Sequence, residues 1–222
     1  MEDNESPPAA WPRAVLFDLL TALLDSWTVW NAAAGGEAAG RAWRAEYLRL
    51  TYGCGSYVPY EELVLRAAAA TGLDAGAAGR LEARWQELPP WDGARELLAH
   101  LAPHCAIGVV TNCSRRLGRV AADRLGVRWD AVVTAEEAGF YKPHPRPYEQ
   151  ALQQLGVRAG ETAFVAGSGF DLFGTARVGL RTYWHNRVGL ALPEGAPSPE
   201  VMSPTLAAVP AWLRGFMNQE NA

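Results

Sequence analysis

The sequence predicts an α/β fold, in which a doubly wound parallel sheet (a Rossmann-like core) carries an inserted helical cap domain. Short, mostly apolar runs recur along the chain, helical patterns separate them, and one long stretch after the first run contains helical patterns only. Apolar runs bounded by turn-forming residues are typical of strands buried on both faces of a parallel sheet. Strands that alternate with helices indicate the doubly wound arrangement. The predicted strands are residues 14–17, 105–110, 131–133, 163–167 and 181–186.

Helical patterns lie between the later strands. Three of them end in or near a glycine, which commonly ends a helix. We expect a Pro-rich loop over residues 192–205 and a final short helix around Trp212. The predicted helices of the core are residues 93–101, 115–126, 145–156 and 174–180.

The stretch after the first strand lacks a convincing buried strand, and its clearest helices are residues 41–50 and 60–70. A helical block of this length predicts a cap over the edge of the sheet where the first strand ends. The acidic, Pro-rich N-terminus predicts a disordered tail. The predicted division is a tail over 1–12, a core of 13–26 and 88–222, and a cap of 27–87.

Composition excludes several classes of protein. Of the 222 residues 49% are hydrophobic and 20% are charged, the formal net charge is −4, and no basic block indicates a nucleic-acid partner. No apolar run approaches the ~20 residues of a membrane span, and the N-terminus has no signal-peptide layout. The three separated cysteines suit reduced thiols. We therefore expect a cytoplasmic protein with a small-molecule substrate and neither a nucleic-acid nor a membrane partner.

Chemically useful side chains follow the predicted strands. Asp18 ends the first strand, Thr111 and Asn112 follow the second, and Lys142 and Asp171 follow the third and fourth. Ligands of an open parallel sheet bind at the carboxyl ends of its strands. A carboxylate held beside a cation can act as a nucleophile. Each residue alone also suits a helix cap or a loop, so the prediction depends on their occurring together.

The segments LFDLLTALLDS, VVTNCS, YKPHPRPY and FVAGSGFDLFG, in this order, resemble the four motifs of the haloacid dehalogenase superfamily. The resemblance covers nearly the whole chain and is greatest to the L-2-haloacid dehalogenase (type II) branch. It implies that Asp18 is the nucleophile, that Lys142 sustains its charge and that Asp171 activates water. It also implies that Thr111 and Asn112 bind the substrate carboxylate or the halide.

The same resemblance implies further residues around the substrate. Tyr148 lies where this branch has a tyrosine at its site. Arg41 corresponds to the essential arginine of the cap, with Arg44 as the rival. Tyr60 and Phe170 correspond to aromatic wall residues, although Tyr60 on a helical face also suits simple packing.

Leu20 separates two reactions. Phosphatases of the superfamily have a second aspartate two residues after the nucleophile, where it protonates a poor leaving group. Leu20 occupies that position and cannot donate a proton, whereas a departing halide needs none. Leu20 therefore favours hydrolysis of a carbon–halogen bond, as in an (S)-2-haloacid dehalogenase, and it would line the substrate pocket.

The fourth motif, AGSGFD, leaves Asp171 as its one acidic residue. Since a Mg²⁺ site is built from carboxylate oxygens, we expect a mechanism without a metal. The alternative is a Mg²⁺ ion held by Asp18 and Asp171.

Three positions depart from the type II branch. Ala22 lacks an expected hydroxyl, and whether Thr21, one position earlier, replaces it is left open by the sequence. Ala166 and Ser168 occupy the positions of a serine and an asparagine that order the lysine and the water. The expected function is hydrolytic dehalogenation of a short 2-haloalkanoate through an aspartyl ester. The alternatives are a degenerate binding or regulatory protein and an atypical Mg²⁺-dependent phosphatase. By resemblance the protein could form a homodimer.

Overall fold

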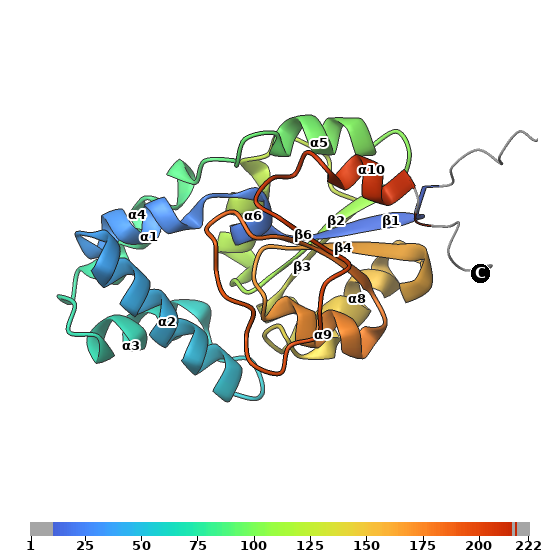
Figure 1. Ribbon diagram of the computed structural model, residues 1–222. Coiled ribbons are helices and arrows are strands. Elements are labelled where there is room, and N and C mark those ends of the chain that lie inside the picture. The colour runs from blue at the N-terminus through green and yellow to red at the C-terminus, as the bar shows by residue number, and fades with distance from the viewer. Residues whose placement is uncertain (1–10, 215, 217–222) are drawn as a thin grey trace, which may run out of the picture.

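The computed structural model describes residues 11–214 and 216, and its strands form one parallel sheet in the order β3-β2-β1-β4-β5-β6 (Figure 1). The α/β fold predicted from the sequence is thereby confirmed. β6 lies in the segment that was predicted to be a loop, and it pairs with β5 at the edge of the sheet. The strands are β1 (Ala14–Asp18), β2 (Ala106–Thr111), β3 (Ala131–Thr134), β4 (Thr162–Ala166), β5 (Arg181–His185) and β6 (Val201–Ser203).

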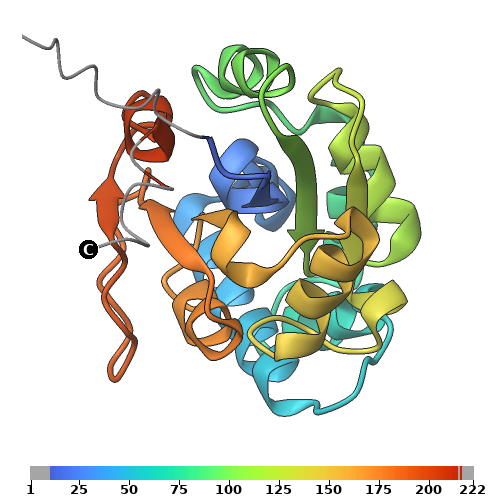
Figure 2. The same ribbon diagram turned by 90° about the vertical axis from the view of Figure 1, so that its right-hand side faces the viewer.

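Helices cover both faces of the sheet (Figure 2). Val15 and Phe17 of β1 pack with α5 (Ala94–Leu101), α6 (Arg115–Asp123) and α10 (Val209–Arg214). Leu16 points to the other face and packs with α8 (Pro145–Leu155) and α9 (Asp171–Val178). Successive residues of a strand point to opposite faces, which explains why all of β1 is buried. The short α7 (Ala135–Ala138) and the 3₁₀ turn Ala159–Glu161 connect these elements.

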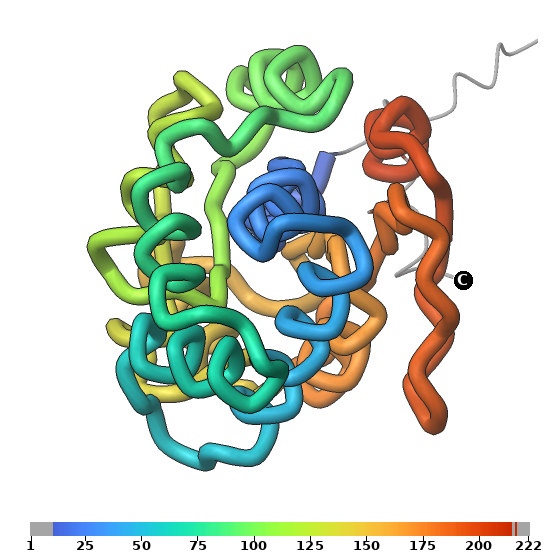
Figure 3. The backbone as a smooth tube through the Cα atoms, turned by 90° about the vertical axis from the view of Figure 1, so that its left-hand side faces the viewer, coloured from blue at the N-terminus to red at the C-terminus, as the bar shows by residue number. Residues whose placement is uncertain are grey.

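Four helices lie beyond the carboxyl end of the sheet, where Figure 3 shows them in front of the strands. They are α1 (Ser26–Ala34), α2 (Glu37–Gly53), α3 (Tyr60–Ala70) and α4 (Ala77–Ala83), followed by the 3₁₀ turn Trp85–Glu87. We call them the α1–α4 segment. The helices predicted over 41–50 and 60–70 lie within α2 and α3. The two connections to the core meet where Leu24 and Pro90 form an antiparallel bridge. That this segment is a separate cap domain stays a prediction.

The N-terminal end of the described chain packs on the core. The ring of Trp11 stacks on His104 with centroids 4.8 Å apart, and Pro12 is buried. Residues 1–10 of the predicted disordered tail lie outside the described residues. Within the described ranges, no helix is both long enough and apolar enough to cross a membrane.

Candidate active site

Asp18 is held by the turn that follows β1. The chain forms a single, fully buried π-helical turn over Leu19–Leu23, a geometry that often marks functional sites. Asp18 Oδ2 accepts hydrogen bonds from Thr21 N (2.8 Å), Thr21 Oγ1 (2.6 Å) and Ala22 N (3.1 Å). Thr21 therefore supplies the hydroxyl that the sequence lacks at Ala22. With three donors on Oδ2, only Oδ1 of this carboxylate is left to face other groups.

Gly167 makes room for this turn. A Cβ at Gly167 would lie 2.2 Å from Ala22 N and 2.3 Å from Thr21 Oγ1. No real side chain tolerates such distances to backbone. The glycine of the fourth motif therefore allows the turn that holds Asp18 to pack directly on the end of β4.

Lys142 bridges two carboxylates. Its Nζ lies 2.8 Å from Asp18 Oδ1 and 2.9 Å from Asp171 Oδ1, and all three side chains are buried. Asn112 fixes the backbone of Lys142, since Asn112 Nδ2 donates to Lys142 O (3.1 Å) and Lys142 N donates to Asn112 Oδ1 (2.7 Å). Asn112 lines the pocket, but its amide, expected to bind the substrate carboxylate or the halide, is engaged in positioning Lys142.

Asp171 has one bonded and one free oxygen. Its Oδ1 accepts from Tyr148 Oη (3.0 Å) as well as from Lys142, whereas Oδ2 is buried and has no hydrogen-bond partner among the described residues. Tyr148 can approach because residue 174 is glycine, where a Cβ would lie 2.4 Å from Tyr148 Cε2. Tyr148 is fully buried and absent from the pocket lining. The sequence predicted a substrate contact for Tyr148, whereas in the structure its hydroxyl orients Asp171.

The three charges shift one another's pKa. Burial opposes ionisation of Asp18, but the charge and hydrogen bond of Lys142 and the hydrogen bonds of Thr21 outweigh it, and the pKa of Asp18 is lowered. Burial lowers the pKa of Lys142, yet the two carboxylates raise it above its usual value. Burial raises the pKa of Asp171; Lys142 acts in the opposite direction and the charge of Asp18 in the same one. Asp18 is thus held ionised, and Asp171 is the stronger base.

Arg44, rather than Arg41, is the buried cation of the pocket wall. Arg44 is 8% exposed, donates from Nη1 to Ser26 Oγ (2.8 Å) and stacks over Trp27 at 4.2 Å. Ser26 Oγ in turn donates to Leu20 O (2.6 Å), which links Arg44 to the turn after Asp18. Arg41 lines the rim of the pocket, where its half-exposed side chain pairs with Glu37 at 2.9 Å. The geometry therefore favours the rival of the residue preferred from sequence.

Two predicted substrate contacts lie behind the pocket wall. Tyr60 packs edge-on against Tyr47 and Trp85, with centroids 5.4 Å and 5.8 Å away, and does not line the pocket. Thr111 is fully buried at the end of β2 and is also absent from the lining. Tyr60 is a packing residue because its helical face points into the α1–α4 segment. Tyr47, missed from sequence, lines the pocket and donates from Oη to Asn112 O (3.0 Å).

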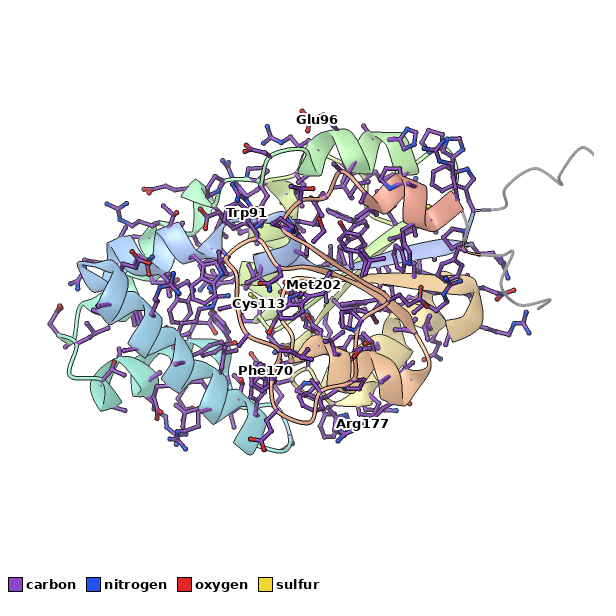
Figure 4. The ribbon with its side chains drawn as sticks, in the orientation of Figure 1. Trp91, Glu96, Cys113, Phe170, Arg177 and Met202 are labelled. Carbon is purple, nitrogen blue, oxygen red and sulfur yellow. The ribbon has the colours of Figure 1, made fainter. Side chains whose placement is uncertain are left out.

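The charged groups open onto a cavity of about 360 Å³. Leu20, Ser168 and Phe170 line it, and Phe170 lies at the boundary between α2 and α9 (Figure 4). Sequence reasoning missed the other wall residues. The lining residues on α2 recur at helical spacing, and this pattern could have predicted them. The lining residues in the loop after β5 have no such pattern. The missed lining residues are Thr21, Trp27, Ala45, Tyr47, Leu48, Tyr52, Pro143, Gly167, Gly169, Leu190, Ala191 and Pro193.

The carboxylates do not form a fitting metal site. Lys142 Nζ lies between Asp18 and Asp171, and Asp171 Oδ2 is the one oxygen of the two carboxylates without a hydrogen bond. In the described part of the chain, no three His, Cys, Asp or Glu side chains are grouped so that they could hold a metal ion. Mg²⁺ can be held by one or two carboxylates and several waters, but an ion shared by Asp18 and Asp171 would have to displace Lys142 Nζ from between them.

Comparison with known proteins places these features in context. Residues 12–179 match a protein family described as haloacid dehalogenase-like hydrolase. Haloacetate dehalogenase H-2 of Moraxella sp. (strain B) is 26% identical over 89% of this chain and 96% of its own length. Pyrimidine 5'-nucleotidase YjjG of Escherichia coli (strain K12) is 34% identical over 51% of this chain and 53% of its own. Among solved structures, the L-2-haloacid dehalogenase from Xanthobacter autotrophicus with chloropropionic acid covalently bound has a TM-score of 0.83 at 23% sequence identity. The match covers 92% of this chain and 99% of that chain.

Proposed function

The chain belongs to the haloacid dehalogenase-like hydrolases, and we propose that it hydrolyses the carbon–halogen bond of a 2-haloalkanoic acid through an ester on Asp18. The observation that carries this proposal is Leu20, which lines the pocket two residues after Asp18. Leu20 cannot protonate an alkoxide, whereas a halide leaves as a weakly basic anion. The dehalogenase relative matches nearly all of the chain and the nucleotidase about half, which agrees with this choice.

In the first step Asp18 Oδ1 attacks C2 of the substrate from the side opposite the halogen. Oδ1 is the nucleophilic oxygen because three donors already bind Oδ2. The new C–O bond forms as the carbon–halogen bond breaks, and the halide takes the bonding electron pair. Lys142 keeps Asp18 ionised. Arg44, buried in the pocket wall, binds an anion, either the substrate carboxylate or the departing halide.

In the second step Asp171 Oδ2 removes a proton from water, and the hydroxide attacks Cγ of the Asp18 ester. Negative charge then develops on Asp18 Oδ2, where Thr21 N, Thr21 Oγ1 and Ala22 N already donate. Preorganised donors of this kind stabilise an oxyanion. Collapse of the intermediate breaks the bond between Asp18 Cγ and the ester oxygen, Asp171 returns its proton to the leaving alkoxide, and a 2-hydroxy acid is released. The second proton of the water remains on the Asp18 carboxyl group and is lost to solvent, which restores the carboxylate. No step requires a metal ion.

Halide release tests the assignment. The purified protein, treated with EDTA, should release chloride from (S)-2-chloropropionate, and Asp18→Asn should abolish release with an unchanged circular dichroism spectrum. Asp123→Asn removes an exposed carboxylate and serves as the matched control with wild-type activity. Turnover by Asp18→Asn would refute the nucleophile. Mg²⁺-dependent hydrolysis of p-nitrophenyl phosphate without chloride release would identify a phosphatase, and neither activity would identify a binding protein.

The two arginines separate in the same assay. Arg44→Gln should raise KM by about 10- to 100-fold, since a charge-assisted hydrogen bond to an anion contributes ~1.5–3 kcal/mol. Arg41→Gln should change KM little, because Arg41 is half-exposed and pairs with Glu37. The reverse order of effects would restore Arg41 as the functional arginine.

A further inference from the structure

We infer that the substrate carries an apolar C2 substituent of roughly four to six carbons, larger than the short chain expected from the sequence. The inference rests on the proposed dehalogenase function and specifies its substrate class. The cavity of about 360 Å³ has the volume of about twelve liquid water molecules at ~30 Å³ each, and we count one water volume for each non-hydrogen atom of a substrate. A 2-chloropropionate anion would fill about half of it. The rest of the cavity must be filled either by another part of the substrate or by water that contacts the surrounding walls.

Those walls are apolar and come from three separate parts of the chain. Leu48 and Tyr52 extend from α2, Phe170 follows β4, and Leu190 and Pro193 come from the loop between β5 and β6. The rings of Tyr52 and Phe170 lie with centroids 4.6 Å apart. Holding water against such surfaces is unfavourable, whereas each methylene of a substrate buried there contributes binding energy.

The loop wall is fixed in place. The Asn186 side chain donates to Leu190 O and accepts from Leu190 N, both at 2.8 Å. Pro193 packs directly on Gly169, where a Cβ would lie 2.5 Å from the proline ring. The space beside Leu190 and Pro193 is therefore a built part of the site.

The charged side chains of the pocket can bind one carboxylate of a substrate, and the apolar side of the pocket suits a neutral group. Lys142 is committed to Asp18 and Asp171, and Arg41 is paired with Glu37. No carboxylate within the described ranges forms an ion pair with Arg44, which is available for the single carboxylate of a 2-haloacid. A second acidic group on the substrate would lie against Leu48, Phe170 or Leu190 without a counter-ion.

A chain-length series tests the inference. Bromide release is measured with 2-bromopropionate, 2-bromobutyrate, 2-bromohexanoate and 2-bromooctanoate. kcat/KM should rise about fourfold per methylene, reach about 50-fold at 2-bromohexanoate relative to 2-bromopropionate, and level off between the four carbons of its C2 substituent and the six carbons of that of 2-bromooctanoate. A flat or falling series with good turnover of 2-bromopropionate overturns the inference and leaves the proposed function intact. Failure to release bromide from every acid instead refutes the proposed function.

Filling the space provides the matched test. Ala191 is exposed but lines the cavity, so Ala191→Phe adds a ring at the cavity wall, and the preference for 2-bromohexanoate over 2-bromopropionate should fall at least tenfold. Leu192→Phe adds the same ring at a position that is 44% exposed and absent from the lining, so the preference should persist. Equal preference in both variants overturns the inference.

Binding to Asp18→Asn gives a readout without turnover, and it serves even if Ala191→Phe does not fold. By calorimetry 2-hydroxyhexanoate should bind at least tenfold more tightly than lactate. Equal affinities overturn the inference.

Discussion

Thr21 offers a sharp test of how the site stabilises its second transition state. Thr21→Val keeps the shape of the side chain and removes the hydroxyl that donates to Asp18 Oδ2 at 2.6 Å, the shortest of the three contacts there. Loss of one oxyanion donor costs about 10²- to 10³-fold in rate. Because two backbone donors remain, we expect the lower end, about 10²-fold in kcat, or ~2.7 kcal/mol.

Pre-steady-state kinetics identify the affected step. Once the ester has formed, Oδ2 is a neutral carbonyl oxygen that gains negative charge again during ester hydrolysis. At a pH where Asp18 stays ionised, Thr21→Val should therefore release one equivalent of halide in a burst and then turn over slowly. The covalent ester should accumulate and be visible by mass spectrometry of the intact protein. Thr21→Ser keeps the hydroxyl and should behave as wild type. Slow halide release without a burst, or an unchanged kcat, would refute this account of Oδ2.

The hydroxyl also acts on the first step through ionisation. The hydrogen bonds of Thr21 help to lower the pKa of Asp18, and the nucleophile must be ionised to attack. The pKa of Asp18 should therefore rise in Thr21→Val, and the acid limb of single-turnover halide release should move to higher pH. Thr21→Ser should keep the wild-type profile, and an identical profile for Thr21→Val would contradict the predicted coupling.

Three further predictions follow from the same geometry. Tyr148→Phe removes the hydrogen bond that orients Asp171, so ester hydrolysis should slow about tenfold or more. The same bond lowers the pKa of Asp171, so the acid limb of ester hydrolysis should move to higher pH in stopped-flow assays. Gly167→Ala should lower the free energy of unfolding by ~1–3 kcal/mol in urea and impair turnover. In the control Gly79→Ala no atom lies within 4 Å of the added Cβ, so this variant should be neutral or more stable by up to ~1 kcal/mol. Burial lowers the pKa of His185 below 6.5 in the folded protein. The free energy of unfolding is therefore highest above that pH and decreases as the pH falls toward the folded-state pKa, because the unfolded chain is protonated first. His185→Gln should weaken this pH dependence of urea unfolding between pH 7.5 and 5.5.

Much of the fold was predictable because it depends on local pattern. The five longer strands and the helices of the core follow from apolar runs and helical periodicity. β6 was missed because it has three residues, lies at the sheet edge and follows a Pro-rich segment. α1 has a signal that was overlooked, since Asp25 caps it by accepting from Thr28 N.

The charged part of the site was predictable for a topological reason. Carboxyl ends of parallel strands lie at one edge of the sheet, and this brings Asp18, Lys142 and Asp171 together. The positions of Tyr148 and Thr111 depend instead on packing between elements. Tyr148 points to Asp171 because residue 174 is glycine, a relation between two helices that no local pattern reveals.

Charge balance links the local geometry to the class of substrate. Counted as ionised groups, Asp18 and Asp171 are balanced by Lys142 and Arg44, so the site is neutral before the substrate enters. A monoanionic haloacid adds one negative charge, and formation of the ester removes the charge of Asp18 while the halide leaves. The net charge of the site in the ester state is then zero again, because the substrate carboxylate supplies the negative charge that Asp18 has lost. A phosphate dianion would leave two negative charges uncompensated in a buried site, at a high desolvation cost. The nucleophile and the three charged side chains around it therefore favour a monoanion with a leaving group that carries its own charge away.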